Sequence, residues 1–289
     1  MTDHKVWFIT GCSTGFGREL AQIAAQQGDQ VVGTLRHDEQ VEAFDYLVPE
    51  HTMGVKLDVT QPDQVAAGIR QALERHGRID VLVNNAGYGS MGALEEVPDE
   101  EVRRQFEVNV FGAINMIKAV LPTMRKQRSG HILNITSIAG VQGFPGLGAY
   151  NASKFALEGI GEALAADVKP LGIRVTNVEP GPFRTDWAGR SANYTQNQID
   201  DYAESAGKNL RSLEQVSGHQ PGDPVKAAQA MYDLVQLENP PMHLPLGEPA
   251  YRGIRAKLQN FLRELDDFEH LGLPTDYTEE EQAAMKENR

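Results

Sequence analysis

The feature that most constrains the fold is a short apolar run that leads into a glycine-rich turn. Lys5–Thr10 reads Lys-Val-Trp-Phe-Ile-Thr, and Gly11, Gly15 and Gly17 follow before a segment of helical composition at Glu19–Gln27. A buried strand, a glycine turn and a helix in this order place free N-terminal amides and the positive end of the helix dipole at the turn. The stretch therefore predicts an anion site, at which glycines let a pyrophosphate approach the backbone.

Further segments that read as strands recur along the chain and alternate with helical segments. After the first run, they occupy residues 31–35, 53–59, 79–83, 131–136, 173–178 and 243–246. This alternation predicts a mainly parallel sheet with helices on both faces and right-handed crossovers. The predicted fold class is a Rossmann-type, doubly wound α/β fold with a seven-stranded sheet.

Composition bounds the classes of partner. The chain has 289 residues, one cysteine (Cys12), and 27 Lys and Arg against 40 Asp and Glu, which gives a net charge of -13. This acidity argues against a nucleic-acid partner.

With no apolar run of transmembrane length and no leader-like N-terminus, we expect a cytoplasmic protein without integral membrane association. With no His-x-x-x-His pair and no second cysteine, no metal site is expected. No linker divides the chain, so we expect one domain over residues 1–289.

The second strand end indicates which nucleotide is bound. Arg36 directly follows the run at 31–35, and no acidic residue occupies positions 34 to 36. In dinucleotide folds a carboxylate at this place bonds the ribose 2′-hydroxyl, whereas an arginine accommodates a 2′-phosphate. We therefore predict NADP(H) in preference to NAD(H), the alternative being that Arg36 is only a solvated cation.

Three polar side chains suggest a proton-transfer site. Tyr150 and Lys154 are spaced i,i+4, so a helix would place the phenol and the ammonium on one face, where the cation would lower the tyrosine pKa. Ser137 ends the strand at 131–136 and precedes Tyr150 by thirteen residues, across a loop rich in glycine. Two hydroxyls aimed at one point could hold a carbonyl oxygen that becomes an alkoxide.

Asn109 lies among apolar residues of the helical segment 100–126, where a structural role is about as probable as a catalytic one. No Gly-x-Ser-x-Gly elbow supports a serine hydrolase.

Taken together, these motifs resemble the short-chain dehydrogenase/reductase family, and within it a bacterial branch similar to hydroxysteroid dehydrogenases. The matches follow the family order over roughly residues 5 to 250: Thr10-Gly-x-x-x-Gly-x-Gly17, Asn84-Asn-Ala-Gly87, Asn109, Ser137, Tyr150-x-x-x-Lys154, and Pro180-Gly181 with Thr185.

The resemblance implies a role for each matched residue. Tyr150 would be the general acid or base, Lys154 would lower its pKa and hold the nicotinamide ribose, Ser137 would position the carbonyl, and Asn109 would hold a water that relays protons. The cofactor-binding residues would be Gly11, Ser13, Thr14, Gly15, Phe16 and Gly17 at the diphosphate and ribose, Arg36 at the 2′-phosphate, Asp58, Val59, Asn85, Ala86 and Gly87 at the adenosine, and Tyr150, Lys154, Pro180, Gly181, Phe183 and Thr185 at the nicotinamide.

The last third of the chain is less regular. Family resemblance makes residues 186–220 a helical substrate lid, and the alternative is a surface helix pair that completes the core. A helix is predicted at 224–237 and an amphipathic helix at 251–265. Residues 275–289 are acidic and have no apolar cluster, which predicts a solvated or frayed tail.

The resulting hypothesis is an NADP-dependent oxidoreductase that acts on a hydrophobic small-molecule ketone, aldehyde or alcohol. By family analogy it would be a homodimer or homotetramer. The alternatives are a non-catalytic NADP-binding redox sensor, which would tolerate loss of Tyr150 or Lys154, and a nucleotide-sugar epimerase or dehydratase, which usually has a larger substrate domain.

Overall fold

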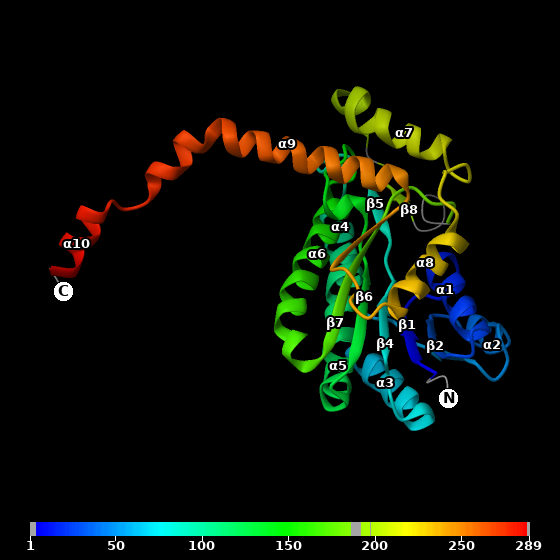
Figure 1. Cartoon of the computed structure of the whole chain (residues 1–289). Coiled ribbons are helices and arrows are strands. Elements are labelled where there is room, and N and C mark those ends of the chain that lie inside the picture. The colour runs from blue at the N-terminus through cyan, green and yellow to red at the C-terminus, as the bar shows by residue number, and fades with distance from the viewer. Residues whose placement is uncertain (1–3, 186–191, 197, 288–289) are drawn as a thin grey trace.

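The protein is built around one seven-stranded parallel sheet. The computed structural model describes residues 4–185, 192–196 and 198–287. The strand order is β3-β2-β1-β4-β6-β7-β9, and every neighbouring pair is parallel (Figure 1). The strands are β1 (Val6–Ile9), β2 (Gln30–Leu35), β3 (Thr52–Lys56), β4 (Val81–Asn84), β6 (Gly130–Ile135), β7 (Ile173–Pro180) and β9 (His243–Leu246). The predicted fold class and all seven predicted strands are confirmed.

Helices cover both faces of the sheet, and the strands divide their side chains between them. Trp7 and Ile9 of β1 pack into the core that contains α1 and α8, whereas Phe8 packs into the core that contains α3 and α5. This alternation follows from the two-residue period of a strand. The helices are α1 (Gly15–Gln26), α2 (Asp38–Asp45), α3 (Pro62–His76), α4 (Asp99–Phe106), α5 (Gly112–Gln127), α6 (Gly148–Val168), α7 (Lys208–Gln215), α8 (Pro224–Gln236), α9 (Glu248–Gly272) and α10 (Glu279–Glu287).

The direction of winding reverses at β1. The chain runs from β1 outward through β2 to β3, and then returns to the other side of β1 at β4. In an open α/β sheet, ligands bind at the carboxyl ends of the strands beside such a reversal. The glycine turn after β1 and the Asn-Asn-Ala-Gly segment after β4 both lie there.

Some features differ from the sequence prediction. A second sheet of two short strands, β5 (Gly89–Met91) and β8 (Ala192–Tyr194), was not expected. Helix α9 is 25 residues long and runs well beyond the predicted end at residue 265.

The C-terminal segment is exposed, and part of it forms a helix, α10, that the sequence did not predict. The Thr278 hydroxyl accepts from the amide of Glu281, and the Glu281 carboxylate accepts from the amide of Thr278 at 2.8 Å. This reciprocal capping box starts helix α10. Among the described residues, no helix is both long enough and apolar enough to cross a bilayer.

Candidate active site

The glycine turn is held tightly against the end of β4. Gly11 has a positive φ of 71°, and a Cβ there would lie 3.0 Å from Ala86 Cα. At Gly17 a Cβ would lie 2.5 Å from Asn85 Nδ2 and 2.7 Å from the Gly11 carbonyl oxygen. The Asn85 side-chain amide donates to the carbonyl oxygens of Thr10 and Gly11 at 2.8 and 3.0 Å. Only glycine fits these two places, because the turn packs directly against the end of β4.

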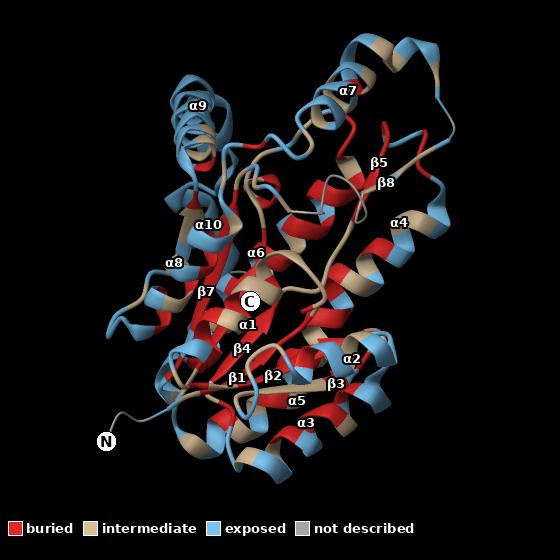
Figure 2. Ribbon diagram, turned by 90° about the vertical axis from the view of Figure 1, so that its right-hand side faces the viewer, coloured by how far each residue is buried: buried red, intermediate tan, exposed pale blue. Residues whose placement is uncertain are grey.

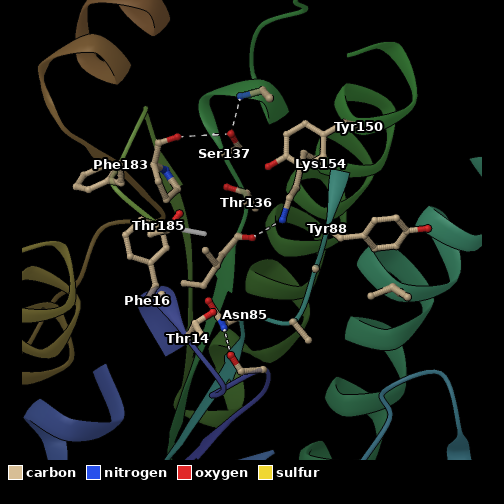
Figure 3. Close-up of a pocket in the computed structure, with 18 of the residues that line it drawn as sticks. Thr14, Phe16, Asn85, Tyr88, Thr136, Ser137, Tyr150, Lys154, Phe183 and Thr185 are labelled. Atoms are coloured by element: carbon tan, nitrogen blue, oxygen red, sulfur yellow. Dashed lines mark hydrogen bonds between the residues drawn. The ribbon is translucent and has the colours of Figure 1, made fainter. Parts of the chain in front are cut away.

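A large cavity of about 1270 Å³ opens over the carboxyl ends of the strands. The glycine turn lines one end of it, and Ser137, Tyr150 and Lys154 line one wall, where their side chains converge in Figure 3. Most of the predicted site residues line it: Gly11, Ser13, Thr14, Gly15, Phe16, Arg36, Asp58, Val59, Asn85, Ala86, Gly87, Ser137, Tyr150, Lys154, Pro180, Gly181, Phe183 and Thr185. Gly17 and Asn109 are not among the lining residues.

Tyr150, Lys154 and Ser137 are brought together by α6 and the end of β6. The Lys154 ammonium donates to the carbonyl oxygen of Ile135 at 2.8 Å and lies 5.8 Å from the centre of the Tyr150 ring (Figure 3). The Ser137 hydroxyl accepts from the amide of Ala139 at 3.0 Å and so caps a short 3-10 turn, Ile138–Gly140. Ser137 and Tyr150 both line the cavity, and their side chains lie near each other in Figure 3.

Burial shifts the pKa values of Tyr150 and Lys154. Desolvation raises the pKa of Tyr150, and the Ser137 hydroxyl opposes this change. The direction is opposite to the one that the i,i+4 spacing predicted, because burial removes solvent from the phenol. Desolvation also lowers the pKa of Lys154 to about 8, against the opposing effect of Glu158. Tyr150 therefore keeps its proton near neutral pH, whereas the pKa of Lys154, at about 8, lies close to that range.

Asn109 lies in a π-helical turn, Glu107–Phe111, which joins α4 to α5. Its side-chain amide donates to the carbonyl oxygen of Tyr88 at 2.8 Å and to the Ser153 hydroxyl at 3.0 Å, and its oxygen accepts from the amide of Tyr88 at 3.0 Å. These bonds fulfil the structural role that the sequence left open. Next to it, a Cβ on Gly87 would lie 3.0 Å from Asn109 Oδ1 and 3.6 Å from Lys154 Nζ, so the amide and the ammonium face the same small space.

Comparison with known proteins decides the family. The model of the short chain dehydrogenase family matches residues 5–195. The chain belongs to the short-chain dehydrogenase/reductase family. It is an oxidoreductase of the class that acts on CH-OH and carbonyl groups with a nicotinamide cofactor.

Several relatives of this short-chain dehydrogenase are similar over most of its length. A 3-ketodihydrosphingosine reductase from Bacteroides thetaiotaomicron is 41% identical over 89% of this chain and 93% of its own. A crystal structure of a short-chain dehydrogenase from Streptomyces avermitilis is 40% identical, with a TM-score of 0.89, and covers 96% of this chain and 100% of its own.

Two structures of more distant relatives hold a cofactor. A short-chain dehydrogenase/reductase from Burkholderia phymatum in complex with NAD is 27% identical, with a TM-score of 0.77 over 96% of this chain and 98% of its own. ElxO with NADP bound is 27% identical, with a TM-score of 0.70 over 84% of this chain and 96% of its own. The family likeness therefore supports a nicotinamide cofactor of either kind.

Sequence reasoning missed part of the dehydrogenase cavity. Its outer wall includes Phe144 and Leu147 from the loop before α6, and Arg252 from the first turns of α9. Leu213, near the end of α7, and Val216, just after it, also line the cavity, which is compatible with the predicted lid at 186–220. Residues 186–191 and 197 of that segment lie outside the described residues. None of these positions belongs to a recognisable motif, and only the tertiary fold brings them to the site.

The single cysteine of this dehydrogenase is a packing residue. Cys12 is fully buried, its thiol donates to the carbonyl oxygen of Ile9 at 3.2 Å, and burial raises its pKa. A thiol in this state is not a nucleophile.

Proposed function

We propose that this protein is an NADP-dependent reductase or dehydrogenase that transfers hydride between the nicotinamide and a carbonyl or secondary alcohol of a hydrophobic small molecule. The observation that carries the proposal is the convergence of Tyr150, Ser137 and Lys154 on one wall of a cavity whose other end is the glycine turn. In reduction, the bound nicotinamide supplies the hydride.

The chain's own residues supply the proton and the orientation. The Ser137 and Tyr150 hydroxyls hold the substrate carbonyl oxygen, and Tyr150 donates its proton to that oxygen as negative charge develops. Lys154, with its pKa near 8, is placed to return a proton toward this group. Asn109, which faces the same space as Lys154 beside Gly87, would position a water for that exchange. In alcohol oxidation the same groups act in reverse.

Arg36 supports the preference for NADP(H). It is exposed at the end of β2 and lines the cavity. The nearest acid along the chain, Asp38, is already paired with Lys56 at 2.8 Å. Arg36 is thus available to bind a 2′-phosphate, while Asp58 and Val59 at the end of β3 would line the adenosine.

A hydrophobic substrate is supported by the outer wall. Phe144, Leu147, Leu213 and Val216 form an apolar part of the cavity above Tyr150. Leu210 and Leu213 of α7 also pack against the buried cluster of Met91 and Tyr150, so the described part of the lid is anchored next to the catalytic tyrosine. The name of the Bacteroides relative agrees with a long-chain ketone as substrate.

We further propose that residues 1–289 form one catalytic domain with a lid at 186–220, and that the enzyme is a cytoplasmic homodimer or homotetramer. The exposed Phe111 and Phe155, on the surfaces of the α4–α5 segment and of α6, are compatible with such an interface.

The test is cofactor consumption with NADPH and with NADH across aliphatic, aromatic and long-chain ketones. We expect turnover with NADPH, highest for long apolar ketones. Tight NADPH binding without turnover on any member of the panel would favour the redox sensor instead. Equal use of the two cofactors would remove the assignment of Arg36.

A further inference from the structure

Helix α9 is exposed along most of its length. Its first two turns contact the body of the protein as far as the structure describes it: Ala250 is buried, and Gly253 packs against Ile138. From Arg255 onward every residue of the helix is exposed, and the helix extends away from the sheet as a free arm (Figures 1 and 2).

The arm carries an apolar stripe that faces solvent. Leu258, Phe261, Leu262, Leu265 and Phe268 are each 49% to 60% exposed. Together with Tyr251 and Ile254, four of them follow the alternating three- and four-residue spacing of a coiled-coil seam: 251, 254, 258, 261, 265 and 268. A monomer rarely leaves such a stripe in water, so the pattern indicates a helical partner.

The charges beside the stripe identify the partner. Arg255 and Asp266 are eleven residues apart, about three turns, so they share one edge of the stripe. Lys257 and Glu264 are seven residues apart, about two turns, and share the other edge. On each edge, the base lies in the first half of the helix and the acid in the second.

We propose that α9 pairs with α9 of a second copy of this chain in an antiparallel arrangement about a two-fold axis. In such a pair the same edge of both helices meets, with the first half of one beside the second half of the other. Arg255 then faces Asp266 of the other copy, and Lys257 faces Glu264. Both pairs are centred on the same point, between Asn260 and Phe261, so a single register satisfies both.

A parallel pair would instead place each of these charges beside its own copy, which is unfavourable.

The size of the contact sets the expected strength. Five apolar side chains, each with roughly 100 Å² to bury, give on the order of 1,000 Å² over both copies, at the small end of specific interfaces. We therefore expect reversible pairing in the micromolar range.

A lipid surface fits less well, because interfacial helices carry mainly Lys and Arg on their polar face. Here Glu264, Asp266, Asp267 and Glu269 crowd the second half.

Charge reversal tests the pairing on the full chain. One protein carries Arg255→Glu and Lys257→Glu, and the other carries Glu264→Lys and Asp266→Lys. None of these residues lines the cavity, so NADPH binding and circular dichroism report that both proteins are folded. In sedimentation velocity, each reversed protein is expected to lose one association step of the wild type, with at least a tenfold rise in dissociation constant. An equimolar mixture of the two should regain that step.

Wild-type sedimentation of either reversed protein would overturn the proposal, and so would a mixture that stays dissociated. Binding of the wild type, through α9, to vesicles of phosphatidylcholine and phosphatidylserine without self-association would replace the second copy by a membrane.

Cross-linking tests the register independently of catalysis. Lys257→Cys and Glu264→Cys proteins, oxidised with diamide, should form a disulfide in the mixture, with little in either protein alone. Arg263→Cys replaces Lys257→Cys as the control, because residue 263 points away from the stripe. The native Cys12 is buried and adds no background. Equal cross-linking of the control would contradict the antiparallel register.

Discussion

A ladder of buried asparagines below the active site gives a quantitative prediction. Asn84, Asn134 and Asn177 are register partners on the adjacent strands β4, β6 and β7. The Asn84 amide donates to Asn134 Oδ1 at 2.9 Å, and the Asn134 amide donates to Asn177 Oδ1 at 3.0 Å. The Asn177 amide donates to the carboxylate of Glu158 at 2.6 Å. The ladder thus ties three strands to α6, which carries Tyr150.

Replacing the middle member leaves two buried groups without partners. In Asn134→Leu, the Asn84 amide and the Asn177 oxygen are orphaned, and each costs about 1 to 3 kcal/mol. We expect the free energy of unfolding to fall by about 2 to 6 kcal/mol, which corresponds to a decrease in Tm on the order of 10 °C. Asn84→Leu orphans only the Asn134 oxygen and should cost about 1 to 3 kcal/mol.

The double variant separates this argument from a general packing defect. Asn84→Leu with Asn134→Leu leaves only the Asn177 oxygen unpaired, so it should cost less than the sum of the two single changes by about 2 kcal/mol or more. Urea unfolding followed by circular dichroism measures all three proteins. Costs that add to within about 0.5 kcal/mol would refute the ladder as an energetic unit.

Two further predictions concern charge. Arg36→Ala should weaken NADPH binding about tenfold and leave NADH binding unchanged, since an exposed ion pair to a phosphate contributes modestly to binding. Fluorescence titration measures both affinities. An equal loss for both cofactors would contradict the 2′-phosphate role of Arg36. Glu158→Gln should change how stability depends on pH. Burial raises the pKa of Glu158 to about 7, so the folded protein keeps a proton that the unfolded chain releases, and this contribution to stability is lost as pH rises through 7. The unfolding free energy of the variant relative to wild type should therefore increase between pH 5 and pH 8, and parallel profiles would show that the carboxyl is not the cause.

The sequence predicts the sheet well because a parallel sheet is buried on both faces. Its central strands are short apolar runs, such as Val6–Ile9 and Val81–Asn84, and glycines or polar residues mark their ends. The motif residues are predictable for a related reason. A turn such as Gly11–Gly17 must adopt an unusual backbone conformation and also pack closely against the end of the neighbouring strand, which leaves few alternatives to glycine.

Other features depend on tertiary context that no local pattern carries. The three-residue strands β5 and β8 pair across about a hundred residues and are too short for a periodic signal. The last seven residues of α9, 266–272, were missed because Asp266, Asp267 and Glu269 interrupt its apolar pattern. The predicted direction of the Tyr150 pKa shift was wrong, because the sequence spacing of Tyr150 and Lys154 reveals a neighbouring cation and not the loss of solvent around the phenol.

The most direct test of the proposed chemistry is single-turnover reduction of a long-chain ketone by prebound NADPH, in the wild type and in Tyr150→Phe. Removing a hydroxyl that donates the proton should slow the turnover by about 10² to 10⁴-fold, while the dissociation constant for NADPH stays the same. A wild-type rate in Tyr150→Phe would contradict the assignment of Tyr150 as the general acid.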